Sequence, residues 1–388
     1  MNKHLLQKIL SQPTVPYRES LVASVIMSEL DRHCVPFFSD PVGNLVIGAE
    51  SLKAYRLRLS KRSSEPLRLF MAHMDHPGFH GIQWENPKRL HVKWHGGSPT
   101  RGLAGSQVWL ATRGGFVGTG RLSEIQMTPS RNALEGAVVQ LASTEVFEKC
   151  KRARELFGAF KFRSEIWNGG QIIYTKAADD LVGSFVVLEL ALKIWGSKKR
   201  FLRNNFVALL TRAEEVGFIG AIGHFELGWL QKARRPVLCV SVETSRTFPG
   251  AEIGKGPVIR LGDRTSIFDP DGTQWLSQIA NKCLSRRHQR RIMDGGTCEA
   301  TAATAFGIKA VGLSIPLGNY HNTNFNGGPD SNVKLGPAPE FVSARDIESC
   351  KKLCFELVRS KMGTKPWHQW RFRFSKMRKQ AERLLGGT

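Results

Sequence analysis

Three apolar runs of the chain end in side chains that can bind a metal ion. LRLFMAH (67–73) ends in His73, FVALLTRAEE (206–215) ends in two carboxylates, and PVLCVSVET (236–244) carries Glu243 near its end. Short runs that are almost wholly apolar are typical of parallel strands buried on both faces. The carboxyl ends of such strands meet at one edge of a sheet, where ligands bind in α/β folds. The pattern therefore predicts an α/β fold with its functional site at that edge.

The sequence pattern of the chain changes between residues 81 and 172. Short β-rich pieces alternate there with Gly-rich turns, which favours a small β-barrel or sandwich inserted into the main domain. The basic segment 148–163 at its end is expected to be a solvated helix face. We therefore expect an α/β main domain with a mixed central sheet and helices on both faces. The expected parts are the main domain at 1–80 and 173–362, the insert at 81–172 and a basic, aromatic C-terminal tail at 363–388.

The composition is that of a globular protein with an excess of positive charge. Fifty-six Lys and Arg against 33 Asp and Glu give a net charge of +23 and a pI near 10.1. Such a field attracts polyanions and anionic substrates but says nothing about the fold. The seven cysteines are scattered without a CxxC pair, which argues against a disulfide framework and a structural zinc finger. The first residues lack the pattern of a signal peptide and no run reaches the ~20 apolar residues of a membrane span, so a cytoplasmic setting is expected.

Two of the candidate site segments combine ligands with a neighbouring carboxylate. In Ala72-His73-Met74-Asp75 the imidazole can bind a metal ion. Asp75 points from the same side of the extended chain, since side chains alternate with period two. Asp75 is therefore expected to hold the other ring N–H of His73 and so orient it. Asp179-Asp180 opens a predicted helix, where a carboxylate can bridge two ions.

The remaining segments supply a base and further ligands. Adjacent carboxylates at a strand end point opposite ways, so in Glu214-Glu215 one can bind metal while the other acts as general base. Glu243 and His321 complete a set of two histidines and three carboxylates. That set fits two divalent ions about 3.5–4 Å apart, with zinc or a similar ion preferred. Each piece alone has a common structural explanation, such as a helix N-cap for the Asp pair. The combination is what favours a metal site.

The order of these motifs resembles that of a known family. The chain is similar to the deblocking or tetrahedral aminopeptidases, which are cobalt- or zinc-activated relatives of glutamyl aminopeptidase among the co-catalytic zinc exopeptidases. The similar stretches are the D-x-x-G-N-L-V-I-G element at 40–48, Ala72 to Asp75, Gly96-Gly97, Lys176 to Gly183, Thr211 to Ala221, Gly254 to Val258, Gly295 to Thr297 and the apolar strand before His321.

The resemblance implies a role for each site residue. It implies that His73, Asp179 and Glu243 surround one ion, while Asp179, Glu215 and His321 surround the other. Glu214 would then be the general base and Asp75 the orienting carboxylate. It also implies that the main domain, at 1–80 and 173–362, is a zinc-exopeptidase-like α/β catalytic domain interrupted by the small β domain. Two divalent ions, zinc first and cobalt as the alternative, and self-assembly in many relatives are implied as well.

The chain departs from the family pattern at four places. Glu243 stands where the family usually has Asp, and Leu181 replaces the Arg that commonly follows the acidic pair. His76-Pro77-Gly78 replaces an acidic and apolar pair, and Glu299 lies one position beyond the usual Asp. These departures bear on substrate choice and assembly more than on the chemistry.

The leading functional hypothesis is a metal-dependent aminopeptidase that hydrolyses the N-terminal residues of peptides. The first alternative uses the same metals on a non-peptide amide, as an N-acyl amino acid hydrolase or deacetylase does. The second is a catalytically inactive relative that binds a polyanion, against which the intact ligands and Glu214 speak.

The tail is the part of the chain that the family pattern does not explain. From Lys361 to Thr388 it carries eight Lys or Arg and one Glu, with Trp367, Trp370, Phe372 and Phe374 among them. This pattern is compatible with nucleic acid or an anionic membrane as partner. We favour packing of the tail on the protein's own surface or on a neighbouring subunit of a homo-oligomer.

Overall fold

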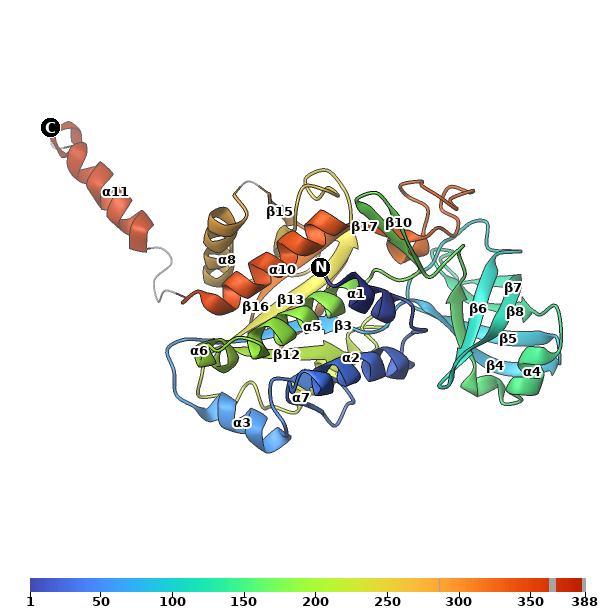
Figure 1. Cartoon of the computed structure of the whole chain (residues 1–388). Coiled ribbons are helices and arrows are strands. Elements are labelled where there is room, and N and C mark those ends of the chain that lie inside the picture. Colours follow the sequence, from blue (N-terminus) through green and yellow to red (C-terminus); the bar gives the residue numbers. More distant parts are fainter. Residues whose placement is uncertain (286, 363–367, 386–388) are drawn as a thin grey trace.

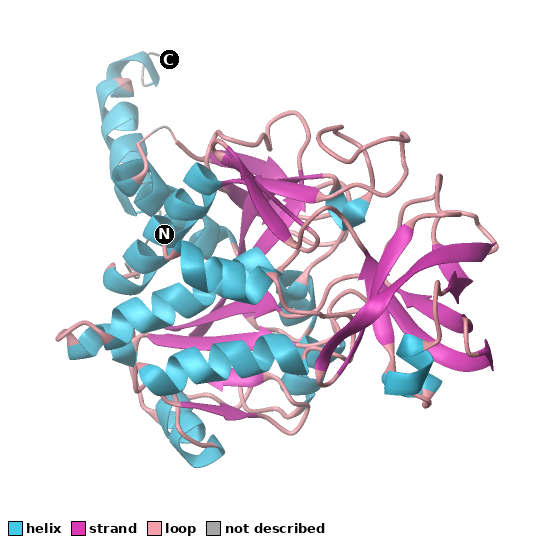
Figure 2. Cartoon of the chain, turned by 45° about the vertical axis from the view of Figure 1, so that its right-hand side comes forward, coloured by secondary structure: helices cyan, strands magenta, loops and turns pink. Residues whose placement is uncertain are grey.

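The computed structural model describes residues 1–285, 287–362 and 368–385. A large mixed sheet covered by helices forms the body, and a barrel built almost entirely of strands lies beside it (Figures 1 and 2). The predicted α/β fold with a β-barrel insert is therefore confirmed. The strands of the main sheet are β1 (Phe37–Ser39), β2 (Leu45–Ile47), β3 (Leu67–His73), β10 (Ile166–Gly169), β11 (Ile172–Thr175), β12 (Phe206–Thr211), β13 (Val237–Arg246), β14 (Val258–Gly262), β15 (Gln289–Ile292), β16 (Lys309–Gly318) and β17 (Glu340–Ser343).

The centre of the main sheet is parallel. Its order is β1-β2-β12-β3-β13-β16-β17-β11-β10, with β14 beside β16 and β15 beside β14. β3 runs parallel to β12 and β13, and all seven of its residues are buried, as expected for a strand covered on both faces. Thr211 pairs with His73, so β12 and β3 end at the same edge. This register brings the side chains that follow the two strands together.

Helices cover both faces of this sheet. One face is covered by α1 (Lys3–Leu10), α2 (Ser20–Arg32), α5 (Leu181–Trp195), α8 (Pro270–Cys283) and α10 (Ala344–Arg359), and the other by α3 (Leu52–Ser60), α7 (Ile219–Glu226) and α9 (Glu299–Ala305). The short α6 (Arg200–Asn204) follows α5. Along β3, Phe70 and Ala72 join the first core while Leu69 and Met71 join the second, because side chains of a strand alternate between faces.

The barrel closes in the order β4-β5-β8-β7-β6-β9. Its elements are β4 (Gly78–Asn86), β5 (Arg89–His95), β6 (Gln107–Thr112), β7 (Gly115–Met127), β8 (Leu134–Gln140), α4 (Glu145–Lys149), the 3-10 helix η1 (Ala153–Glu155) and β9 (Phe157–Phe160). The barrel strands thus start before residue 81 and end before residue 172. Residues 166–175 form β10 and β11, which extend the main sheet through the pairing of β11 with β17.

The segment 148–163 differs from the predicted helix face. Within it, α4 ends at Lys149 and the 3-10 helix η1 spans only Ala153–Glu155, and Phe157–Phe160 forms the buried strand β9 between β4 and β6. The charged residues before it make the segment look like a solvated helix. Burial of Phe157 and Phe160, each 1% exposed, closes the barrel and decides the conformation instead.

The tail forms α11 (His368–Gln380) and α12 (Glu382–Leu385), which stand away from the body in Figure 1. Trp370, Phe372 and Phe374 are exposed, so the expected packing on the chain's own surface is wrong for these residues. Trp367 lies outside the described residues. Among the described helices, we find none with the length and apolar character to cross a membrane.

Candidate metal centre

The first half of the site forms where β3 ends. His73 is the last residue of β3 and is 1% exposed. Its Nε2 lies 3.4 Å from Oδ1 of Asp179 and 3.7 Å from Oε2 of Glu214. Asp179 precedes α5, and Glu214 follows β12, whose register with β3 places it here.

The second half forms on the turn after β16. His321 lies in the 3-10 helix η2 (Tyr320–Asn322), and its Nε2 is 2.9 Å from Oε2 of Glu215 and 3.7 Å from Oδ2 of Asp179. The ring of Tyr320 stacks on His321, with centroids 3.7 Å apart. The two oxygens of Asp179 therefore face two different imidazoles. This is the arrangement of a carboxylate that can bridge two cations.

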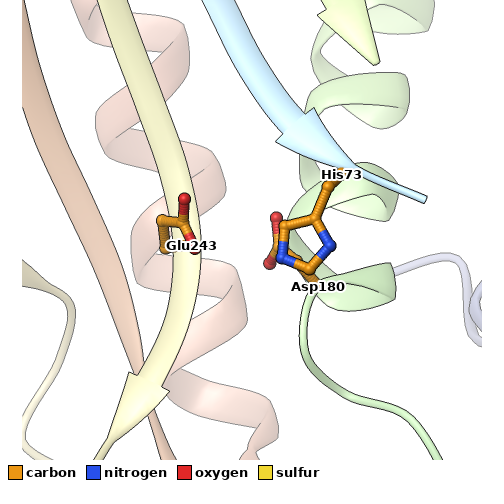
Figure 3. Close-up of side chains that lie close together, drawn as sticks. All are labelled: His73, Asp180 and Glu243. Carbon is orange, nitrogen blue, oxygen red and sulfur yellow. The ribbon is translucent and has the colours of Figure 1, made fainter. Parts of the chain in front are cut away.

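Glu243 faces His73 from the neighbouring strand β13. Donor atoms of His73, Asp180 and Glu243 lie within 4.8 Å of one another, and so do those of His73, Asp179 and Glu215 (Figure 3 shows the first group). Asp180 was not among the predicted ligands, because the family resemblance assigned that role to Asp179. Asp180 caps α5, since its Oδ1 accepts from the N–H of Gly183, but its buried Oδ2 has no hydrogen-bond partner among the described residues.

The donor set fits divalent cations. Asp180 Oδ2 and Glu215 Oε1 are buried and have no hydrogen-bond partner among the described residues. His321 Nε2 faces Glu215 Oε2 at 2.9 Å but without the geometry of a hydrogen bond. Buried polar atoms are costly when unpaired, and clustered carboxylates repel one another. Carboxylate oxygens and imidazole nitrogens are the ligands that zinc and similar ions prefer. Cations at this place would satisfy both the unpaired atoms and the excess negative charge.

The pKa shifts follow from the same crowding. Burial, followed by repulsion between neighbouring carboxylates, raises the pKa of Glu215 well above its usual range. For Glu214 and Asp180 burial also raises the pKa well above normal, against the attraction of His73. Burial opposes the charged form of His73, but Glu214 and the other carboxylates outweigh it and raise its pKa. Because metal ligands bind in their deprotonated form, loading this cluster is expected to release protons.

Asp75 holds the neighbouring turn rather than the ring of His73 alone. Its Oδ1 accepts from the N–H of Glu214 at 3.0 Å, and its Oδ2 accepts from the N–H of Glu215 at 3.1 Å. The carboxylate lies 3.6 Å from Nδ1 of His73, whereas the main-chain oxygen of Asp75 lies 3.1 Å from that nitrogen. The main chain therefore gives the closer contact to the ring, and the carboxylate fixes the two glutamates.

Glu340, at the start of β17, accepts hydrogen bonds from the two loops that carry Asp179 and His321. Its Oε1 accepts from the N–H of His321, and its Oε2 accepts from those of Ala178 and Asp179. It is fully buried, and burial raises its pKa well above the usual range. Sequence reasoning missed it because nothing local marks a strand-starting glutamate as a partner of two distant loops.

His76, three residues after the end of β3, contacts the same two loops. Its Nδ1 is 2.6 Å from the main-chain oxygen of Asp179, and its Nε2 is 3.0 Å from Oδ1 of Asn322, whose amide donates to the main-chain oxygen of Lys176. Burial lowers the pKa of His76 to about 4. The departure at position 76 thus places an imidazole in contact with both loops.

Glu299, the other departure, lies beside the site without joining a ligand group. It is the first residue of α9, is fully buried, and accepts a hydrogen bond from the hydroxyl of Thr211. Burial, reinforced by Glu243, raises its pKa to about 8.

A cavity of about 400 Å³ opens in front of these side chains. Beyond the metal-site residues, its wall contains Arg246, Phe248, Arg260, Met293 and Asp294. Arg260 is 3% exposed and its Nε makes no hydrogen bond within the described protein. The cavity therefore combines a cluster of carboxylates with guanidinium groups on its wall.

The fold and the site together define a class of protein: an α/β domain interrupted by a barrel, with a buried cluster of histidines and carboxylates at the ends of its strands. The family can be stated as well. Residues 55–325 match the M42 glutamyl aminopeptidase family, and because this is more than half of the chain, the chain belongs to that family. Membership in this family makes the chain a peptidase and supports metal-dependent aminopeptidase activity.

Solved structures confirm the fold. The TET1 peptidase of Pyrococcus horikoshii, described as assembling into a tetrahedron or a large octahedral shell, is 21% identical with a TM-score of 0.70, covering 92% of this chain and 98% of its own. A TET aminopeptidase from a marine sediment archaeon of the Thaumarchaeota is 19% identical with a TM-score of 0.71, covering 92% and 96%. An aminopeptidase of Desulfurococcus kamchatkensis is 21% identical with a TM-score of 0.69, covering 92% and 94%.

Proposed function

We propose that the chain is a dinuclear metallo-aminopeptidase that hydrolyses the N-terminal residues of peptides. The observation that carries this proposal is the position of Asp179, whose two oxygens face His73 and His321 separately. One ion would be held by His73, Asp179 and Glu243 and the other by Asp179, Glu215 and His321, with zinc preferred and cobalt as the alternative. When bound, such ions supply Lewis acidity toward the scissile carbonyl and lower the pKa of a water molecule.

Glu214 is the proposed general base. It lies beside His73 in the wall of the cavity, while its neighbour Glu215 faces His321. In this role Glu214 accepts a proton from the attacking water and returns it to the leaving amine. The hydrogen bonds from the N–H groups of both glutamates to Asp75 keep their two carboxylates pointed at these different tasks.

The cavity wall supports a preference for acidic N-terminal residues. Arg246 and the buried Arg260 line it, and a guanidinium pairs well with a carboxylate. The carboxylates at the metal centre would favour the positively charged α-amino group of a peptide. We therefore expect peptides that begin with Glu or Asp to be the better substrates.

The same arginines support the second candidate, an N-acyl amino acid hydrolase. Such a substrate carries a free carboxylate that Arg246 or Arg260 can bind but has no free amine. A panel of aminoacyl p-nitroanilides, led by those of Glu, Asp, Leu and Lys, and of N-acetylated amino acids separates the two. Turnover of the aminoacyl compounds, fastest for Glu and Asp, supports the proposal. Turnover of the N-acetylated compounds alone would transfer the function to the second candidate.

Assembly and setting complete the proposal. Because the P. horikoshii TET1 peptidase is described as a shell-forming particle, we propose that this chain also forms a homo-oligomer. A cytoplasmic setting is supported by its seven cysteines, all of which are free.

A further inference from the structure

Helix α11 exposes apolar side chains that no described part of the chain covers. The exposed fractions are 69% for Phe372, 58% for Phe374, 54% for Met377 and 38% for Trp370. The described interactions of α11 include the ring contact of Trp370 with Phe374, whose centroids lie 5.7 Å apart, and the ion pair of Arg378 with Glu382. Figure 1 shows the helix pointing away from the body. Exposed apolar groups gathered on one element mark an interaction surface.

Three of these side chains form a stripe along the helix. Trp370, Phe374 and Met377 follow the spacing i, i+4, i+7, which places them on one face. We call these three residues the apolar stripe. Phe372 lies two residues from Trp370 and Phe374, so its side chain projects from the opposite side of the helix.

Positive charge surrounds the apolar stripe. Between residues 368 and 380 the helix has five cations and no acidic residue, and these cations are exposed. They are Arg371, Arg373, Lys376, Arg378 and Lys379. The occupant of this surface must therefore offer both negative charge and an apolar interior.

We propose that α11 is an interfacial helix that binds the surface of a membrane containing anionic lipids. Head groups of such a membrane attract the five cations, and the acyl region beneath them accepts the apolar stripe. At 13 residues the helix is roughly 20 Å long, which suits it to lie along the surface.

Other occupants match only part of this surface. The α11 helix of a second copy carries the same five cations, so two such helices repel one another. A nucleic acid pairs with the cations, but its backbone offers no apolar layer for Met377.

Sedimentation of the full-length protein with vesicles tests the proposal. The vesicles are phosphatidylcholine with or without phosphatidylserine. We expect binding only when phosphatidylserine is present. Replacing the apolar stripe (Trp370→Ser, Phe374→Ser and Met377→Ser together) should lower the partition coefficient at least tenfold, since each buried apolar side chain contributes strongly. Neutralising two cations (Arg373→Gln with Lys376→Gln) should lower it by about tenfold or more.

Phe372→Ser is the matched control, because it removes an exposed aromatic ring from the other side of the same helix. It should change vesicle binding by less than about threefold, and all variants should keep the aminoacyl activity of the unchanged body. Full-length protein that stays in the supernatant with phosphatidylserine vesicles overturns the proposal. So does binding to a DNA or RNA oligonucleotide without vesicle binding, or a fall in oligomer mass as the only effect of changing the stripe.

Discussion

Two pairs of adjacent acidic residues supply most of the negative charge at the metal centre, and each pair divides its tasks. Asp179 faces both imidazoles, whereas Asp180 caps α5 with one oxygen. Glu215 lies near His321, whereas Glu214 lies near His73 and borders the cavity. Neighbouring residues in the sequence therefore serve different purposes because their side chains point different ways.

Glu214→Gln tests the proposed base. Glutamine keeps the shape of the side chain but cannot accept the proton, so turnover of an aminoacyl reporter should fall by about 10²–10⁴-fold. Metal content, measured by elemental analysis, should stay at the wild-type value. Turnover within threefold of wild type would assign the proton transfer to another group.

Asp75→Asn tests how the two glutamates are held. Both oxygens of Asp75 accept main-chain N–H groups, and asparagine replaces one acceptor by a donor. Metal affinity should fall by about 10–100-fold, as for other partners that orient metal ligands. Competition with a chelator of known affinity measures this. An unchanged affinity would show that the turn keeps its position without Asp75.

Among the elements, the strands that carry the candidate ligands could be predicted, because burial on both faces leaves a local pattern in the sequence. LRLFMAH is wholly buried in β3, and its last residue reaches the site. The contacts of Glu340 and His76 could not be predicted. The partners of His76 lie more than 100 residues away in the chain. Those of Glu340 lie on two separate loops. Strand β9 was missed because barrel closure, a tertiary effect, overrides its local pattern.

The loop after β5 brings the barrel into contact with the metal centre. A Cβ atom added at Gly97 would lie 1.9 Å from Nδ1 of His321, so this position has no room for a side chain. Gly97→Ala should displace the His321 ring and lower the metal content per chain. Gly114→Ala is the control, because its added Cβ would meet only the Thr112 hydroxyl at 3.5 Å. Equal metal content in the two variants would contradict the contact.

At the scale of the whole molecule, Lys176 connects the barrel with the catalytic domain. It is 3% exposed, its Nζ lies 5.5 Å from the ring centre of Trp109 in β6, and it donates to the main-chain oxygen of Gln12. Burial lowers the pKa of Lys176 from 10.5 to about 7. Above that pH the folded protein holds a neutral amine, whereas the unfolded chain stays protonated up to about pH 10.

This shift predicts how stability depends on pH. Since the unfolded state binds more protons between pH 7 and 10, the contribution of Lys176 to the unfolding free energy rises with pH in that window and is lost as pH falls toward 7. The slope is at most about 1.4 kcal/mol per pH unit. Denaturant unfolding of wild type and Lys176→Met at pH 7, 8 and 9 measures this slope. The unfolding free energy of the wild type should rise relative to that of Lys176→Met as the pH increases. Parallel curves for the two proteins would contradict the shift.

We propose that His73 and His321 hold two different ions around Asp179, and this can be measured as metal stoichiometry. Purified wild-type protein, His73→Ala and His321→Ala are loaded with zinc, freed of excess and analysed for metal per chain and for aminoacyl reporter activity. We expect two ions in the wild type, fewer in each variant, and loss of activity on chelation with recovery on reloading. Two ions per chain in both variants, or full activity of the chelated wild type, would contradict the proposed ligand set.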